Sequence, residues 1–77
     1  MVEDARTVAQ MKPGELAIIS GFTDEDLSVK LMEMGCLPGM PVRFNFEAPF
    51  GDPICISVSG YELSLRIEEA ATISIIR

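Results

Sequence analysis

The 77-residue sequence contains no histidine and no tryptophan, and these absences exclude much chemistry. Without histidine the chain lacks the commonest general base, the usual partner of a nucleophilic serine or cysteine, and the commonest metal ligand. The two cysteines, Cys36 and Cys55, are far apart and form no Cys-x-x-Cys motif. No glycine-rich phosphate-binding motif is present. We therefore expect a protein that is not an enzyme, with no catalytic residues and no bound cofactor.

Basic residues are scarce, and no long apolar run occurs. Twelve acidic residues against six basic ones give a formal charge of −6. Nucleic acids and anionic membrane surfaces attract Lys and Arg, so we expect neither as a partner. No run approaches the roughly 20 apolar residues of a transmembrane helix, and residues 1–4 are acidic rather than typical of a signal peptide. These features predict a cytoplasmic location.

The length allows one small domain. Hydrophobic residues make up 48% of the chain and charged residues 23%, as in a folded globular protein. We expect a single domain over residues 1–77, with its core between about 13 and 76. At this size the core is thin.

One segment has helical periodicity. Thr23 is a predicted N-cap, and three acidic residues follow it in the first turn, where the helix dipole favours negative charge. Gly35 is a predicted C-terminal cap, and Pro38 prevents continuation. The helix is expected over residues 24–34, with its inner face formed by Leu27, Leu31 and Met34.

The remaining elements alternate with a period of two. Thr7–Met11 is predicted to form a helical turn that rests Val8 and Met11 on the body, and Gly21 to end the first strand. Val42, Phe44 and Phe46 are expected to face one side of their strand. The predicted strands are 15–20, 41–47, 54–59, 61–67 and 72–76. Five short strands with one helix after the first favour a mainly β fold, a small antiparallel barrel.

Three segments in order resemble a known family. They are Leu31-x-x-Met34-Gly35-x-Leu37-Pro38-Gly39, then Ala48-Pro49-Phe50-Gly51-Asp52-Pro53, then Gly60-x-x-Leu63-x-Leu65-Arg66-x-x-Glu69-Ala70-x-x-Ile73. This pattern is similar to the FeoA family, small cytoplasmic accessory proteins of bacterial ferrous iron transport. The resemblance implies a five-stranded SH3-like barrel. It also implies a partner, the membrane transporter FeoB, which carries a cytosolic G-protein domain. Cys36 departs from the aliphatic residue expected there.

Most of these motif residues have structural interpretations. Gly35 caps the helix, Pro38 and Gly39 turn the chain into the next strand, and Gly60 permits a tight reversal. The connection Gly51-Asp52-Pro53 shapes a hairpin. Leu63 and Leu65 are expected to fill the barrel, and Arg66 to bridge a carboxylate or carbonyls near Glu68 and Glu69.

Phe50 is the candidate for partner binding. It lies in a turn-rich connection, where a large apolar group has little core to enter. Either it folds back over the barrel mouth, or it is an exposed anchor of the kind enriched at interface hot spots. Leu37 and Met40, in the loop after the helix, are expected to extend the same patch.

Other functions remain open at this point. The cysteines are either unrelated reduced thiols, the favoured interpretation, or a soft metal or redox site. The acidic residues 24–26 and 68–69 are better explained by a helix start and a solvated turn than by a cation site, so no Fe²⁺ ligand is assigned. The leading function is a binding module that modulates the transporter. The alternatives are an Fe²⁺ sensor or carrier and a polyproline-binding SH3-like adaptor. Open strand edges leave the oligomeric state undecided.

Overall fold

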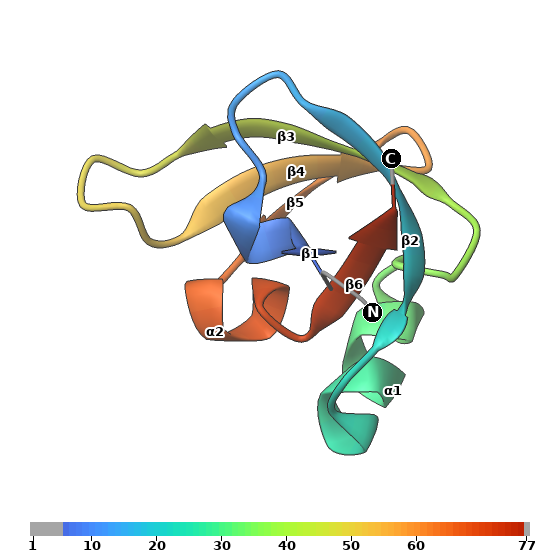
Figure 1. Cartoon of the computed structure of the whole chain (residues 1–77). Coiled ribbons are helices and arrows are strands. Elements are labelled where there is room, and N and C mark those ends of the chain that lie inside the picture. The colour runs from blue at the N-terminus through green and yellow to red at the C-terminus, as the bar shows by residue number, and fades with distance from the viewer. Residues whose placement is uncertain (1–5, 77) are drawn as a thin grey trace.

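The computed structural model describes residues 6–76, which form one antiparallel sheet with three short helices (Figure 1). The strand order is β1-β6-β2-β3-β4-β5. In chain order the elements are β1 (Arg6–Thr7), the 3₁₀ helix η1 (Val8–Gln10), β2 (Leu16–Phe22), α1 (Glu25–Glu33), β3 (Pro41–Glu47), β4 (Ile54–Val58), β5 (Tyr61–Leu65), α2 (Ile67–Ala70) and β6 (Ile73–Ile76).

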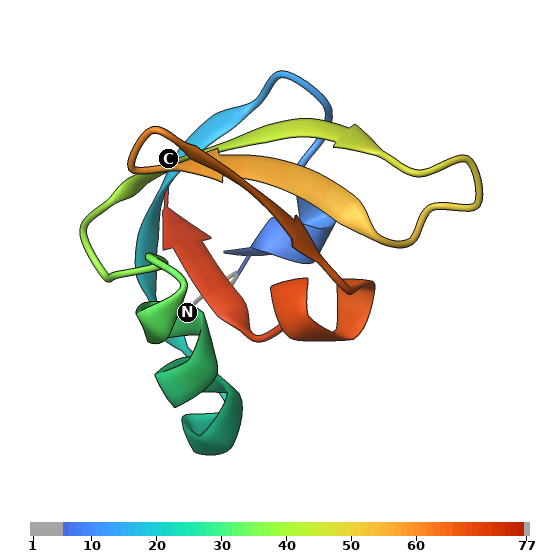
Figure 2. The same ribbon diagram turned by 180° about the vertical axis from the view of Figure 1, so that it is seen from behind.

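The predicted fold class is confirmed. Five strands of four to seven residues pair antiparallel, and α1 follows the first of them. Two details differ from the prediction. The two-residue strand β1 adds a sixth member, and the sheet is curled but not closed, because β1 and β5 each pair with a single neighbour. Figure 2 shows η1 and α2 on the concave side of the sheet, while α1 lies at one end.

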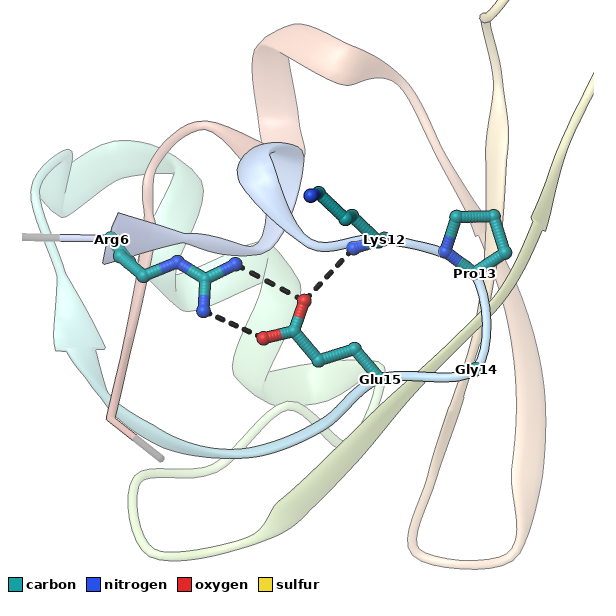
Figure 3. Close-up of a pocket in the computed structure, with 5 residues that line it drawn as sticks. All are labelled: Arg6, Lys12, Pro13, Gly14 and Glu15. Carbon is teal, nitrogen blue, oxygen red and sulfur yellow. Dashed lines mark hydrogen bonds and ion pairs between the residues drawn. The ribbon is translucent and has the colours of Figure 1, made fainter.

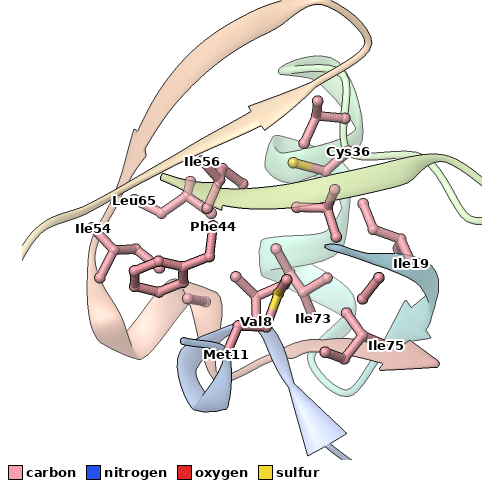
Figure 4. Close-up of a cluster of buried hydrophobic side chains, with 14 of the residues drawn as sticks. Val8, Met11, Ile19, Cys36, Phe44, Ile54, Ile56, Leu65, Ile73 and Ile75 are labelled. Atoms are coloured by element: carbon pink, nitrogen blue, oxygen red, sulfur yellow. The ribbon is translucent and has the colours of Figure 1, made fainter. Parts of the chain in front are cut away.

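The core lies on this concave side (Figure 4). It contains the inward residues of all the longer strands, and both Val8 and Met11 pack into it as predicted. Ile73 and Ile75, predicted to share a face of the last strand, are both buried. The members are Val8, Met11, Ala17, Ile19, Leu31, Cys36, Val42, Phe44, Ile54, Ile56, Val58, Leu65, Ala70, Ile73 and Ile75.

Strand β3 corrects one prediction about which side chains face inward. Val42 and Phe44 are buried, but Phe46 is 58% exposed. Phe44 pairs with Ile56 and Phe46 with Cys55, so β3 contains one extra residue, Asn45, between the two pairs. This bulge moves Phe46 to the outer face of the sheet, which a strict alternation does not allow.

Two element boundaries also differ from the prediction. Strand β2 does not stop at Gly21 but continues to Phe22, with a register shift between Ile19 and Gly21 against β6. The N-cap of α1 is Asp24 rather than Thr23, because the Asp24 side chain accepts a 3.0 Å hydrogen bond from the Leu27 N–H. Gly35 follows the helix at φ +109°, the left-handed conformation for which a C-terminal glycine is suited.

Within residues 6–76, neither α1 nor any other helix is long and apolar enough to cross a membrane.

Candidate functional site

Phe50 stands at the tip of the hairpin between β3 and β4. The Gly51 N–H donates to the Ala48 carbonyl at 2.7 Å, and the Ala48 N–H donates to the Pro53 carbonyl at 2.9 Å. This turn leaves the Phe50 side chain 98% exposed. Phe50 therefore does not fold back over the barrel mouth. Of the two interpretations drawn from the sequence, the structure fits the exposed one.

Phe46 adds a second exposed aromatic to the same hairpin. The bulge at Asn45 turns it outward, as described above. We call the exposed side chains of Phe46, Pro49 and Phe50 the hairpin surface. Sequence reasoning missed Phe46, since its position in the alternation matches that of the buried Phe44.

Leu37 and Met40 lie in the loop between α1 and β3. Leu37 is 44% exposed, whereas Met40 packs partly against the core. Two hydrogen bonds fix this loop to β2: the Gly39 N–H donates to the Ile19 carbonyl at 2.7 Å, and the Ile19 N–H donates to the Met40 carbonyl at 2.9 Å. The loop is thus held firmly beside the sheet.

The structure does not bring these three residues into one patch. Figures 1 and 2 show the hairpin that carries Phe50 at one end of the sheet and the loop that carries Leu37 and Met40 at the other. The expectation of a continuous surface is therefore wrong. Each end of the sheet presents a separate candidate surface.

Asp52 links the hairpin to the body of the protein. Its Oδ1 accepts a 2.9 Å hydrogen bond from the Ile67 N–H, at the first residue of α2. An acidic side chain at this point satisfies one of the free N–H groups of the helix start. The sequence indicated only a turn role for Asp52, because nothing local connects it with a helix fifteen residues away.

In the part of the chain that the structure describes, the predicted bridge from the Arg66 side chain is not observed, and other groups bind the Glu69 carboxylate instead. The backbone N–H of Arg66 donates to Glu69 Oε1 at 3.0 Å, and the ion pair to Glu69 comes from Lys30 Nζ at 2.9 Å. The Lys30 hydrogen bond, then the Arg66 backbone bond, hold the pKa of Glu69 below its ordinary range. This pair joins α1 to α2.

The other motif residues support the fold. Leu65 is fully buried, and Leu63 packs partly against the core. Gly60 follows Ser59 in a two-residue turn with φ of +82° and +54°. Gly39 and Gly51 also have positive φ, at +91° and +88°.

The two cysteines occupy different environments. Cys36 belongs to the core, and burial raises the pKa of its thiol. Cys55 is also buried but faces the outer side, where Asn45 Nδ2 lies 3.7 Å from its sulfur and donates to Ser57 Oγ at 2.8 Å. The thiols therefore do not share a site. In the part of the chain that the structure describes, no group of three or more His, Cys, Asp or Glu side chains is placed to hold a metal ion.

A surface pocket lies near the start of β2, and the polar groups that line it are hydrogen-bonded to one another (Figure 3). The Arg6 guanidinium donates to both Glu15 carboxylate oxygens, at 2.6 and 3.1 Å. The backbone N–H of Lys12 donates to the same carboxylate at 2.9 Å. Together these bonds join β1, the following turn and β2.

Comparison with known proteins assigns the family. The family model for the FeoA domain matches residues 6–77. A search of curated proteins gave no match. Among solved structures, the chain resembles a FeoA-like protein from Clostridium acetobutylicum with a TM-score of 0.86 and 28% identity, over 96% of this chain and 87% of that one.

Two further structures agree. A FeoA from Stenotrophomonas maltophilia, described as a prokaryotic SH3 domain protein in complex with zinc, matches with a TM-score of 0.82 and 25% identity, over 92% of this chain and 89% of that one. The structure of ScaR with bound Zn²⁺, 24% identical, matches with a TM-score of 0.83 over the whole of this chain but 39% of its own, and shows only a shared fold. The chain is therefore a member of the FeoA family, with the SH3-like fold that its sequence resemblance implies.

Proposed function

We propose that this protein is a non-catalytic accessory protein of bacterial ferrous iron uptake, which acts in the cytoplasm by binding the FeoB-type transporter at its cytosolic G-protein domain. Membership of the FeoA family supports the transport role. The Stenotrophomonas maltophilia relative is itself described as a candidate activating factor of ferrous iron transport.

The observation that carries the binding role is the 98% exposure of Phe50. When a partner covers an apolar ring that was exposed to water at the tip of an ordered hairpin, the free energy of the system falls. Aromatic side chains of this kind dominate interface hot spots. Phe46, 58% exposed on the same hairpin, extends the apolar area, while Leu37 offers a second, separate contact.

Regulation of the transporter follows from binding only under one condition. The accessory protein must bind two conformations of the G domain with unequal affinity, since a ligand shifts an equilibrium only by its differential affinity. The nucleotide state of the G domain is the natural variable, so affinity is expected to differ between its GDP and GTP forms.

The test is an amide NMR titration of the labelled protein with the soluble G domain of the cognate transporter. It is run with GDP, with a GTP analogue and without nucleotide. We expect saturable shifts around Phe46 and Phe50, and an affinity that depends on the nucleotide. Phe50→Ala is expected to weaken binding about tenfold or more, as the loss of a hot spot does.

The matched control is Val29→Ala, which truncates another exposed apolar side chain, 56% accessible, on α1. It is expected to bind like the unmodified protein. Shifts confined to the Leu37 loop would move the contact to the other end of the sheet. Spectra that stay unchanged in all three nucleotide conditions would contradict the proposal, and a stoichiometric Fe²⁺ isotherm would then favour a sensor or carrier.

A further inference from the structure

Strand β5 forms an open edge of the sheet. It pairs with β4 on one side only, and the connecting turn, Ser59-Gly60, has two residues with positive φ. In such a hairpin the residues flanking the turn exchange ladder hydrogen bonds, and every second pair does the same. The backbone N–H and C=O groups of Glu62 and Ser64 therefore point away from β4, toward the free edge.

This edge is short and well defined. Glu62 and Ser64 are both exposed. Within residues 6–76, no hydrogen bond to their outward backbone groups from another element or side chain is observed. The next outward N–H, that of Arg66, is already satisfied by Glu69 Oε1 at 3.0 Å. Two donors and two acceptors are thus left for a strand from outside.

We infer that two copies of this chain pair through β5, antiparallel, about a two-fold axis at Leu63. In this register Glu62 of one copy lies opposite Ser64 of the second, and Ser64 opposite Glu62. The outward groups of both residues then meet outward groups of the other copy, which gives about four ladder hydrogen bonds. The edge is therefore complementary to itself, which is what an isologous dimer requires.

The side chains support the same register. Glu62 lies opposite a serine rather than opposite the second Glu62, so the closest cross-strand contact carries no like-charge repulsion. Arg66 is exposed directly after β5 and its backbone is still extended, so continuing the same register brings it diagonal to Glu62 of the second copy. Each dimer has two such opposite-charge diagonals and one Glu62–Glu62 diagonal, so attraction outweighs repulsion.

Tyr61 adds apolar burial. Its side chain is 69% exposed at the start of β5. The two-fold register places it opposite Leu65 of the second copy, next to the central pair of Leu63 side chains. Both edges are only five residues long. The association is therefore weak, and the dimer is populated only at high protein concentration.

The test is sedimentation equilibrium of the full chain between about 10 µM and 1 mM, a range that covers weak complexes. We expect a reversible monomer–dimer equilibrium. Ser64→Pro removes one outward donor per copy and no bond to β4, since proline is tolerated where its nitrogen faces out from an edge. It is expected to raise the dimer dissociation constant about thirtyfold, through two lost hydrogen bonds. The control, Ser64→Thr, keeps the donor and should dimerise normally.

A second pair of variants keeps the test decisive if proline disturbs the fold. Arg66→Glu places like charges on both diagonals and should weaken the dimer, whereas Glu62→Lys combined with Arg66→Glu should restore it. A chain that stays monomeric at 1 mM, which would mean affinity weaker than about millimolar, overturns the inference. So does a dimer that responds to neither Ser64→Pro nor the charge exchange, because its interface then lies elsewhere. Neither readout involves the transporter, so this inference stands or fails apart from the proposed function.

Discussion

The body of the protein and the hairpin that projects from it share strands β3 and β4, but aromatic side chains are buried in the body and exposed in the hairpin. In the body, Phe44 is 2% exposed and packs with the strands around it. In the hairpin, Phe46 and Phe50 are 58% and 98% exposed. The change takes place within three residues, at the bulge of Asn45. The same residue type thus supplies stability on one side of the bulge and an accessible surface on the other.

This comparison separates what holds the fold from what is available to a partner. The Phe44 side chain is not available to a partner, because removing it from the core would cost stability. The hairpin surface can change without a large effect on the fold, since its rings contact little. Substitutions in the two regions should therefore have different effects on stability.

The largest difference in the loss of stability is expected between alanine substitutions of two phenylalanines on the same strand. Phe44→Ala should reduce the free energy of unfolding by about 3–5 kcal/mol, because it leaves a cavity in a small core. That is comparable to the whole stability that a core of this size provides, so much of the variant should be unfolded. Phe46→Ala should change stability by no more than about 0.5 kcal/mol. Urea denaturation followed by circular dichroism measures both.

Phe44→Leu provides a variant that remains folded and gives a measurable loss. Its cost should lie between those of the two alanine substitutions. Equal losses for Phe44→Ala and Phe46→Ala would mean that the bulge does not separate a packed region from an accessible one.

An intermediate effect is expected where the hairpin is tied to the body. Asp52→Ala removes the acceptor of the Ile67 N–H and should cost about 1 kcal/mol, as the loss of a helix cap does. Hydrogen exchange at the Ile67 amide should speed up more than exchange in β3. The control is Glu47→Ala, which also removes an acidic side chain from this hairpin. It should leave the exchange rate of the Ile67 amide unchanged. An Ile67 amide that exchanges at the same rate in both variants would place the anchor of the hairpin elsewhere.

The smallest effect is a dependence of stability on pH. The pKa of Glu69 is lowered in the folded protein, first by the Lys30 hydrogen bond. A lowered folded pKa gives stability that is present above the ordinary glutamate pKa and is lost as the pH falls through the folded value. Glu69→Gln should therefore be destabilising at neutral pH, by less than about 1 kcal/mol because the Lys30 side chain is 59% exposed, and equal to the unmodified protein in acid.

Urea denaturation at a series of pH values measures this difference, with Glu68→Gln as the control of equal charge on the same turn. A loss for Glu69→Gln that is as large in acid as at neutral pH would indicate a packing effect rather than the ion pair.

Much of the fold follows from local patterns in the sequence. The period of two identified the strands of the body, and the i, i+4, i+7 spacing of Leu27, Leu31 and Met34 identified α1. These patterns succeed because one face of each element meets a single core. The predicted turns at Gly35 and Gly60 were likewise correct, since positive φ is a local requirement that glycine meets.

The failures have a different physical origin. The bulge at Asn45 is invisible because Phe46 continues the apolar alternation, and only the pairing with β4 reveals the extra residue. An isolated glycine in a strand is typical of a bulge, so Gly21 did carry a signal of the shift that follows Ile19. The Asp52–Ile67 and Lys30–Glu69 contacts join residues distant in sequence, and no local pattern specifies them. For the same reason the separation of Phe50 from Leu37 could not be predicted.

The burial of Cys36 has a practical consequence. Its thiol is fully enclosed directly before Leu37, and burial raises its pKa, so the reactive thiolate is both rare and inaccessible in the folded state. Alkylation at Cys36 can proceed only when the segment between α1 and β3 opens. In a Cys55→Ser background, the rate of alkylation of Cys36 measures how often that segment opens. A partner bound over Leu37 would slow the alkylation. The chain thus contains its own reporter of native-state opening at one of its two candidate surfaces.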